Sequence, residues 1–402
     1  MNSSTTTPML RLIGLAAFCS MASMRVCDPM LVALSVEYKI STGDASAVIA
    51  AFAVAYGVLQ LVYGPLGDWL GKVRVIIGAT AACAVFSALT AVAPQFPLLV
   101  AARAAMGAAA AGIIPLSMAW IGDQVAYAQR QETLARLMAA VVMGMMAGQW
   151  FGGLATETLG WRSALAGLAV LFAVAAALLF RHARASGVLR SPARAAGAAP
   201  FSLVGYLAAA RALLRVPRVR WVLAAVTIEG GLAFGTLAFV PARMTDGFGL
   251  SAAAAGGVMV LYGVGGLVYS MFARRWLALL GERGLALAGG MLVGVGLLAL
   301  AWGPGLVWAV PGCFLAGVGF YMLHNTLQVQ ATQMAPEARG TAVTLFACLL
   351  FLGQSTGVLL VAISVDRGWL PPVFSAAAAG IALLGWLVSR RVPARAVAAG
   401  AC

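Results

Sequence analysis

The sequence has 402 residues, of which 62% are hydrophobic and 9% are charged. An ordinary soluble domain carries about 25% charged residues, so this composition excludes a water-soluble globular protein and favours a chain embedded in a bilayer. The net charge of +14 does not indicate nucleic-acid binding, because the basic residues are spread between hydrophobic stretches and form no single stripe. The six cysteines include no CxxC pair, so we expect neither a disulfide framework nor a metal site.

Apolar stretches long enough to cross a bilayer follow one another along the whole chain. The first half contains six of them, at approximately 9–34, 45–66, 75–93, 97–121, 137–158 and 162–180. The second half contains another six, at approximately 221–242, 252–273, 284–302, 306–333, 341–364 and 371–389. The runs are continuous rather than alternating, which favours helices over strands. We therefore expect an all-α polytopic membrane protein with twelve transmembrane helices.

A basic stretch at 181–219 separates the sixth and seventh spans. It is rich in Ala, Gly, Ser and Pro and contains no acidic residue. Its arginines are Arg181, Arg184, Arg190, Arg194, Arg211, Arg215 and Arg218, and Arg220 follows directly after it. This composition is typical of a linker. The expected organisation is an N-terminal six-helix bundle (1–180), a basic cytoplasmic linker (181–219) and a C-terminal six-helix bundle (220–402).

The distribution of Lys and Arg predicts the orientation of the chain. If the N-terminus is cytoplasmic, twenty of the 26 basic residues lie on the cytoplasmic side, and only four lie outside. Such a bias follows the positive-inside rule. We therefore expect an inner-membrane protein of a bacterium with both termini in the cytoplasm.

The two halves of the sequence also repeat each other. Residues 56–63 (YGVLQLVY) match residues 262–269 (YGVGGLVY) at an offset of 206, and Gly148-Gln149 matches Gly353-Gln354 at an offset of 205. Two matches at nearly one offset predict two pseudo-symmetric bundles. Transporters built from parallel halves bind substrate between the halves near the midplane.

The segment after the second span combines glycines with one acid and two basic residues. Its key positions are Gly64, Gly67, Asp68, Gly71, Lys72 and Arg74. This segment resembles the signature loop of the major facilitator superfamily, although Trp69 stands where the family usually has a basic residue. The resemblance implies that Asp68 gates the transporter by holding the two halves together on the inside, against a helix that begins near Gly340. The alternative is that Asp68 only terminates a helix.

An arginine lies inside the fourth span, in the sequence Arg103-Ala-Ala-Met-Gly107, which resembles the arginine motif of the same superfamily. A charge in hydrocarbon is costly unless it is paired, and it marks a functional site by default. Asp28 lies at a similar depth in the first span, and Arg25 precedes it by one helical turn. We interpret Asp28, Arg25 and Arg103 as a proton-coupling cluster, with a static ion-pair network as the alternative.

The fifth span presents small residues at helical spacing. They form the sequence Gly144-x-x-x-Gly148-Gln149-x-x-Gly152-Gly153. The pattern resembles the antiporter motif of the drug–proton antiporter branch, with Gln149 in place of its proline. Close helix packing alone would also explain such glycines.

Polar residues in the second half indicate a substrate cavity. Glu229 lies near the middle of the seventh span, and we expect it to carry a proton or attract a substrate. The tenth span contains the polar residues His324, Asn325 and Gln328, and Trp150 of the fifth span is a further candidate for the cavity wall. Hydrogen bonding between helices is the alternative for each polar group.

Together these features predict a secondary transporter similar to the twelve-helix drug–proton antiporters. The expected function is proton-coupled export of a small amphipathic organic compound. The alternatives are transport of a specific metabolite such as a siderophore or sugar, and uncoupled facilitation. We expect no enzyme activity, no cofactor other than the proton gradient, and no metal or nucleic acid. The expected partners are a small-molecule substrate, protons and the lipid bilayer, and the chain is expected to be monomeric.

Overall fold

A computed structural model describes residues 3–190, 208 and 210–392 of the chain. These residues form helices and short turns, and no strand is found among them. Eleven helical segments in this part of the chain are long and apolar enough to cross a membrane. They are Thr7–Tyr38, Thr42–Leu70, Lys72–Ala91, Phe96–Gln124, Gln129–Thr158, Trp161–Ala185, Pro217–Phe248, Ala252–Trp302, Leu306–Gln333, Pro336–Val365 and Leu370–Arg391.

One of these segments, α14 (Ala252–Trp302), is 51 residues long and contains two spans. At Gly281 the backbone takes φ 63° and ψ 175°, which is a conformation that glycine adopts without steric cost. Because the helix is interrupted there, the eleven segments correspond to twelve spans. The prediction of an all-α polytopic membrane fold is confirmed. The gap predicted between the eighth and ninth spans, at 274–283, contains this break, and the rest of the gap is helical.

The chain divides into two compact units. Unit 1 comprises Met1–Leu207 and Gly249–Val260, and unit 2 comprises Ala208–Phe248 and Leu261–Cys402. The start of α14 thus belongs to unit 1, and the rest of α14 belongs to unit 2. Part of the sequence-predicted linker, including Arg194, lies outside the described residues, whereas Arg181 and Arg184 belong to the last turns of α9.

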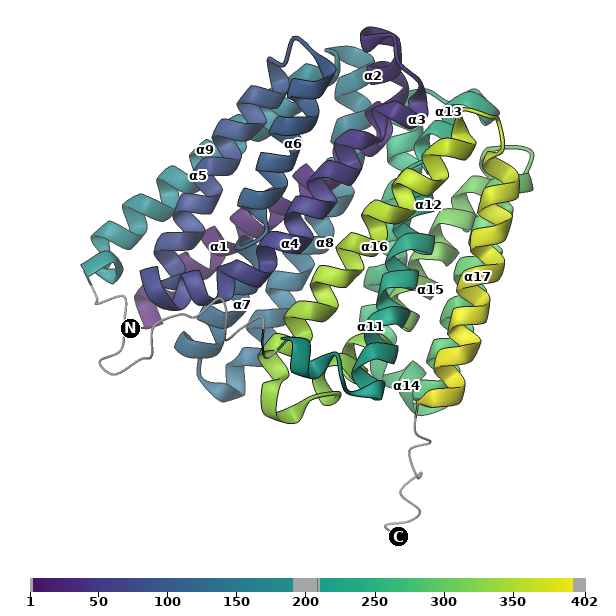
Figure 1. Ribbon diagram of the computed structural model, residues 1–402. Helices are drawn as coiled ribbons and strands as arrows, with labels where there is room; N and C mark the ends of the chain where they lie inside the picture. The colour runs from purple at the N-terminus through teal and green to yellow at the C-terminus, as the bar shows by residue number, and fades with distance from the viewer. Residues whose placement is uncertain (1–2, 191–207, 209, 393–402) are drawn as a thin grey trace. The chain divides into compact units, whose positions relative to one another are not determined.

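Unit 1 contains the helices of the first half (Figure 1). Their bounds are α1 Ser3–Arg25, η1 Asp28–Met30, α2 Leu31–Tyr38, α3 Thr42–Ala45, α4 Ala47–Leu70, α5 Lys72–Ala91, α6 Phe96–Ala110, α7 Ile113–Gln124, α8 Tyr127–Thr158, α9 Trp161–Ala185 and η2 Val188–Arg190. The main packing pairs are α1 with α8, α5 with α9 and α4 with α6.

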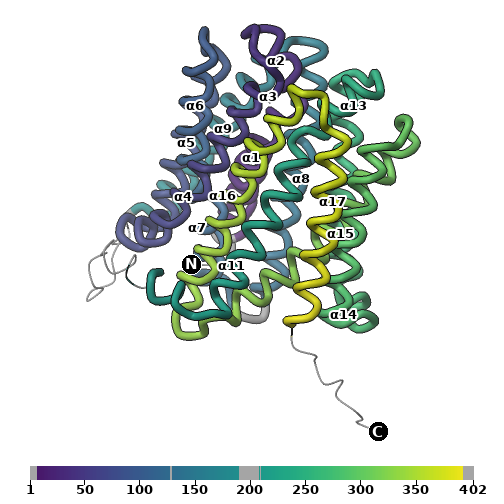
Figure 2. The backbone as a smooth tube through the Cα atoms, turned by 45° about the vertical axis from the view of Figure 1, so that its right-hand side comes forward, coloured from purple at the N-terminus to yellow at the C-terminus, as the bar shows by residue number. Residues whose placement is uncertain are grey.

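Unit 2 contains the remaining helices, in which α11 packs against both α16 and α17 (Figure 2). Their bounds are α11 Pro217–Glu229, the π-helical turn η3 Gly230–Phe234, α12 Gly235–Leu237, α13 Val240–Phe248, α15 Leu306–Gln333, η4 Pro336–Ala338, α16 Arg339–Val365 and α17 Leu370–Arg391.

Glycines bring α1 onto α8 in unit 1, and α11 onto α16 in unit 2. A Cβ atom at Gly148 would lie 2.3 Å from the carbonyl oxygen of Ala22, and one at Gly353 would lie 2.1 Å from that of Thr227. Both partners of the second contact lie 205 residues after those of the first. The sequence repeat is therefore also a repeat of helix packing, in which small residues allow backbones to approach closely.

Two spans are interrupted beside an acidic residue. The first span breaks after Arg25, where Pro29 lacks an amide hydrogen and disfavours helical geometry at Asp28. The seventh span changes from α-helix to π-helix after Glu229, and π-helical turns are frequent at functional sites. The candidate acids thus lie at irregular backbone rather than inside regular helices.

Candidate functional site

The structure brings Asp28 and Arg25 together in the interior of unit 1. Arg25 Nη1 lies 3.4 Å from Asp28 Oδ2, and the two side chains are 1% and 0% exposed. Gln149 of α8 donates from Nε2 to the same oxygen at 3.4 Å. Asp28 Oδ1 and Gln149 Oε1 have no hydrogen-bond partner among the described residues. The carboxylate is therefore buried and only partly satisfied, which is costly for a group that stays ionised.

Arg103 lies near this pair without forming an ion pair to Asp28 in the described structure. Its Nη1 donates to the carbonyl oxygen of Ser23 at 2.9 Å, and its Nε donates to that of Val48 at 3.3 Å. The guanidinium also lies 4.4 Å from the centre of the Phe52 ring. Arg103 therefore joins α6 to α1 and α4 through backbone oxygens, and it acts on Asp28 through its charge.

The fifth-span motif residues of α8 line the contact with α1. An added Cβ atom at Gly144 would lie 2.3 Å from the carbonyl oxygen of Phe18, and one at Gly152 would lie 2.3 Å from that of Val26, just after α1. Gly153 faces another way, toward the carbonyl oxygen of Ala252 at the start of α14. The same motif that positions Gln149 beside Asp28 thus also fixes the helix spacing. Glycine packing and the polar contact are two roles of one segment.

Glu229 pairs with His324 in the interior of unit 2. Glu229 Oε2 lies 2.9 Å from His324 Nδ1, with the side chains 0% and 15% exposed. The Phe320 ring stacks on His324 at 5.1 Å, and the Phe346 ring lies 5.6 Å away. Glu229 Oε1 has no partner among the described residues. Sequence analysis singled out both residues but did not predict that they pair.

The other predicted cavity residues are not gathered at this pair. Asn325 bonds to Tyr269, and Gln328 is exposed. Trp150 belongs to unit 1, where it is 49% exposed and lines a recess with Met146 and Gly257. These three residues are therefore distributed over separate surfaces of the two units.

The predicted gating loop is mostly helical. Residues Gly64 to Leu70 form the end of α4, and Gly71, with φ 94°, is the single residue before α5. Asp68 is 72% exposed and lies 3.3 Å from Lys72. The segment that resembles the signature loop is therefore mostly helical, and the single residue Gly71 links the two helices. Contact with the helix near Gly340 stays a prediction.

Lys72 has a second partner that sequence analysis missed. Its Nζ lies 2.7 Å from Asp123 Oδ2 at the end of α7, closer than it lies to Asp68. Arg74 donates to the carbonyl oxygens of Leu70 and Leu189. The sequence places Asp123 at the end of the fourth span, on the same predicted cytoplasmic side as Lys72 and Arg74. This position could have suggested the contact. Only the fold shows that the two helix ends meet.

A cavity of about 690 Å³ was also missed. It lies between α1, α7 and α8 in unit 1. Its wall combines apolar and polar groups, namely Thr7, Leu10, Arg11, Gly14, Leu15, Phe18, Ile121, Gln129, Glu132, Thr133, Arg136, Leu137, Ala140 and Met143. Glu132 and Arg136 form an ion pair at 2.6 Å. This volume lies within the range of small-molecule sites.

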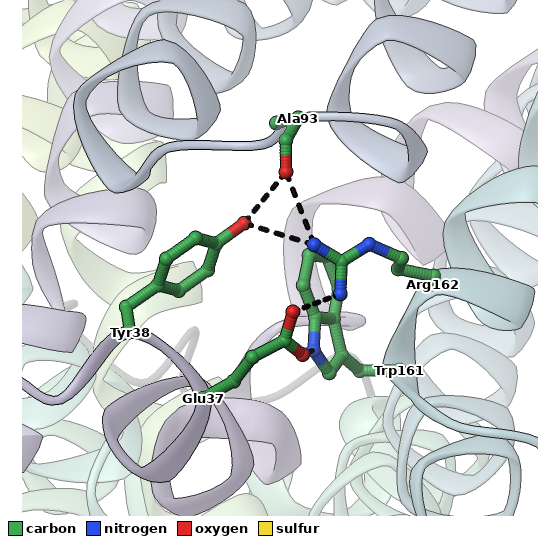
Figure 3. Close-up of polar contacts among 5 residues, drawn as sticks. All are labelled: Glu37, Tyr38, Ala93, Trp161 and Arg162. Carbon is green, nitrogen blue, oxygen red and sulfur yellow. Dashed lines mark hydrogen bonds and ion pairs between the residues drawn. The ribbon is translucent and has the colours of Figure 1, made fainter.

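Elsewhere in unit 1, hydrogen bonds join the end of α2, the residue Ala93 after α5 and the start of α9 (Figure 3). Arg162 and Trp161, at the start of α9, both donate to the carboxylate of Glu37. Arg162 Nη2 also donates to the carbonyl oxygen of Ala93 at 3.1 Å, to which the Tyr38 hydroxyl donates at 2.9 Å. The arginine stacks over the Trp161 ring at 4.2 Å. We call these five residues the Arg162 cluster.

The sequence and the fold both resemble those of known transporters. The family model of the Major Facilitator Superfamily matches residues 13–358. The chain is 25% identical to the MFS-type transporter YceJ of Bacillus subtilis, over 82% of each chain. It is 26% identical to a chloramphenicol resistance protein of Streptomyces lividans, again over 82% of each chain. The crystal structure of the nucleoside transporter NupG has a TM-score of 0.75 and 16% identity, and covers 98% of this chain and 100% of that chain.

The helical fold, the internal repeat and the buried charged residues are those of a polytopic membrane transporter. The chain belongs to the Major Facilitator Superfamily, as the match over most of its length shows. The resemblance inferred from the sequence motifs is thereby confirmed.

Proposed function

We propose that this protein is a proton-coupled exporter of a small amphipathic organic compound. It acts in the inner membrane of a bacterium, with both termini in the cytoplasm. The observation that carries the proposal is the buried cluster of Asp28, Arg25 and Gln149, with Arg103 nearby. An ionisable group at such a position is costly, so its presence there marks a functional site by default.

In the proposed mechanism Asp28 binds and releases the coupling proton. Burial favours the neutral acid, and a nearby arginine favours the carboxylate. Arg25 Nη1 and Gln149 Nε2 each lie 3.4 Å from Asp28 Oδ2. A small movement of either side chain therefore changes the balance between these two effects. One access state holds Asp28 ionised near the arginine, and the other state separates them and favours protonation. The free energy needed is modest, since a tenfold change in occupancy corresponds to about 1.4 kcal/mol.

The substrate class is supported by the cavity between α1, α7 and α8. Its wall combines apolar side chains with polar and charged ones, which suits an amphipathic molecule of drug-like size. Export is supported by two relatives, the chloramphenicol resistance protein of Streptomyces lividans and the cephamycin export protein CmcT of Amycolatopsis lactamdurans. CmcT is 30% identical over 46% of this chain and 40% of its own length. The glycine motif of α8 agrees with an antiporter.

The test is transport by Asp28→Asn in inverted membrane vesicles, with substrates chosen from a screen of amphipathic compounds. The variant keeps the shape of the side chain but cannot exchange a proton. We expect it to lose accumulation driven by a pH gradient while it retains downhill exchange, measured as counterflow on the same preparation. Arg103→Ala should impair the same uphill step, because the proton is then poorly released.

The matched control is Asp44→Asn, which removes an exposed carboxylate of the same unit. It should transport as the unmodified protein does. If Asp28→Asn still accumulates substrate in response to a pH gradient, Asp28 is not the coupling acid and Glu229 becomes the candidate. If the unmodified protein equilibrates its substrate without responding to a pH gradient, the protein is an uncoupled facilitator.

A further inference from the structure

A second cavity lies in unit 2, where α11 begins and α17 ends. It has a volume of about 440 Å³, and its wall consists of Pro217, Arg218, Trp221, Val222, Gln330, Arg391 and Val392. The proposed transport cycle assigns no role to it. Its lining contains two guanidinium groups and no carboxylate.

The two arginines are held in place without being neutralised. Arg218 Nη2 donates to Gln330 Oε1 at 3.1 Å, and Gln330 donates in turn to Glu282 at 3.3 Å. The Arg391 guanidinium lies 5.1 Å from the centre of the Trp221 ring. Within the described part of the chain, neither arginine forms an ion pair. Gln330 thus lies between Arg218 and the carboxylate of Glu282.

The first turn of α11 adds hydrogen-bond donors to this positive region. The helix begins at Pro217 and has no side-chain cap at Val216. The amide groups of Arg218 and Val219 therefore have no partner within the helix. A helix N-terminus attracts anions through these groups and through the helix dipole. Two guanidiniums and an uncapped helix end around one cavity form a site for a phosphate group.

The surface beside the cavity indicates where the phosphate comes from. Leu387 and Leu383 precede Arg391 by four and eight residues, so they lie on the same face of α17. Both are apolar and exposed, at 38% and 55%. An acyl chain along this face would place its headgroup at Arg391. Basic pockets between membrane helices bind anionic lipid headgroups in this way, and Trp221 is typical of the interface.

We propose that this cavity binds the phosphate group of an anionic phospholipid, held by Arg218, Arg391 and the start of α11. The acyl chains follow the face of α17 that carries Leu387 and Leu383. The site is distinct from the buried acids and does not require that the protein be proton-coupled or an exporter.

The test is native mass spectrometry of the purified full-length protein in detergent, titrated with dioleoyl phosphatidylglycerol or dioleoyl phosphatidylcholine. We expect preferential binding of one phosphatidylglycerol. The double variant Arg218→Gln/Arg391→Gln should weaken this binding by about tenfold or more, since it removes both positive charges that hold the phosphate group.

Arg390→Gln is the matched control, because Arg390 lies at the same helix end but stacks on Trp386 and does not line the cavity. It should bind the lipid as the unmodified protein does. Equal loss in the control and the double variant would overturn the proposal, as would equal binding of the two lipids by the unmodified protein. Thermal unfolding identifies any variant that fails to fold, and the lipid comparison on the unmodified protein decides the question in that case.

A final arm uses soluble sn-glycerol 3-phosphate as a competitor. If it displaces phosphatidylglycerol only weakly, the lipid assignment holds. If it binds as tightly as the lipid, the phosphate chemistry stands but the membrane is not the source, and the lipid proposal is overturned.

Discussion

The buried acids of the two units differ in the kind of partner they have. Asp28 in unit 1 pairs with Arg25, whereas Glu229 in unit 2 pairs with His324. Arginine stays charged at every physiological pH, while histidine can lose its charge. The counter-charge of Asp28 is therefore fixed, and that of Glu229 is variable. The two halves have kept the same backbone packing but not the same electrostatics.

The internal repeat shows that the two acids do not occupy corresponding positions. At the offset of 205 residues, Asp28 corresponds to Ala233 and Glu229 corresponds to Met24. Neither acid thus has an acidic counterpart in the other unit. We expect the two acids to have separate roles, with proton coupling at Asp28 and substrate recognition at Glu229.

The shared packing should be the most sensitive feature. Gly148→Leu and Gly353→Leu each place a side chain against a backbone carbonyl of the neighbouring helix, and we expect destabilisation by about 3 kcal/mol or more. The measurement is the yield of folded protein and its thermal unfolding in detergent. Gly78→Leu, at an open helical position, is the control and should be tolerated. A normal yield of folded Gly148→Leu or Gly353→Leu would mean that the two helices can move apart without loss of stability.

The two acids should be separable by transport. In Glu229→Gln we expect the apparent affinity for substrate to fall by about tenfold, roughly 1.4 kcal/mol, while uphill accumulation persists at saturating substrate. In Asp28→Asn we expect the apparent affinity for substrate to persist while uphill accumulation is lost. The measurement is initial rate against substrate concentration, with and without a pH gradient. Loss of uphill accumulation in Glu229→Gln would remove the distinction between the units.

Asp68→Asn should have a smaller effect, on rate rather than on coupling. The fold should persist because Lys72 keeps its closer partner Asp123. We expect turnover to fall by about tenfold, since one access state loses stabilisation of about 1.4 kcal/mol. The rate of counterflow at saturating substrate measures this. Turnover equal to that of the unmodified protein would leave Asp68 as a helix terminator only.

The smallest effect should come from the Arg162 cluster. Arg162→Ala removes contacts to Glu37, Tyr38 and Ala93, and we expect a loss of about 1 kcal/mol of stability at this partly exposed site. Thermal unfolding should detect it, and transport at low temperature should be unchanged. A transport defect without any change in stability would assign the cluster a role in the cycle. Arg367→Ala is a suitable comparison, because it removes a cation over a tryptophan ring without a carboxylate.

The sequence predicted those features that depend on local pattern. Length and hydropathy predicted the spans, and the match of Gly148 with Gly353 predicted a repeat that the helix packing reproduces at these two glycines. Sequence depth placed Arg103 near Asp28, but it could not show that the guanidinium bonds to backbone carbonyls. The Glu229–His324 and Lys72–Asp123 contacts join residues 95 and 51 positions apart. Such contacts depend on which helices become neighbours, and hydropathy does not encode that choice. The gap predicted between the eighth and ninth spans contains Gly281, but the sequence did not show that the chain stays helical on both sides of this glycine.

The close packing of α8 on α1 at its glycines also limits access to Asp28. Added Cβ atoms at Gly144, Gly148 and Gly152 would overlap carbonyl oxygens, so neither a lipid tail nor a water molecule fits between the two backbones there. In the proposed mechanism, we therefore expect the proton to reach Asp28 from a face of α1 that is not packed on these glycines of α8.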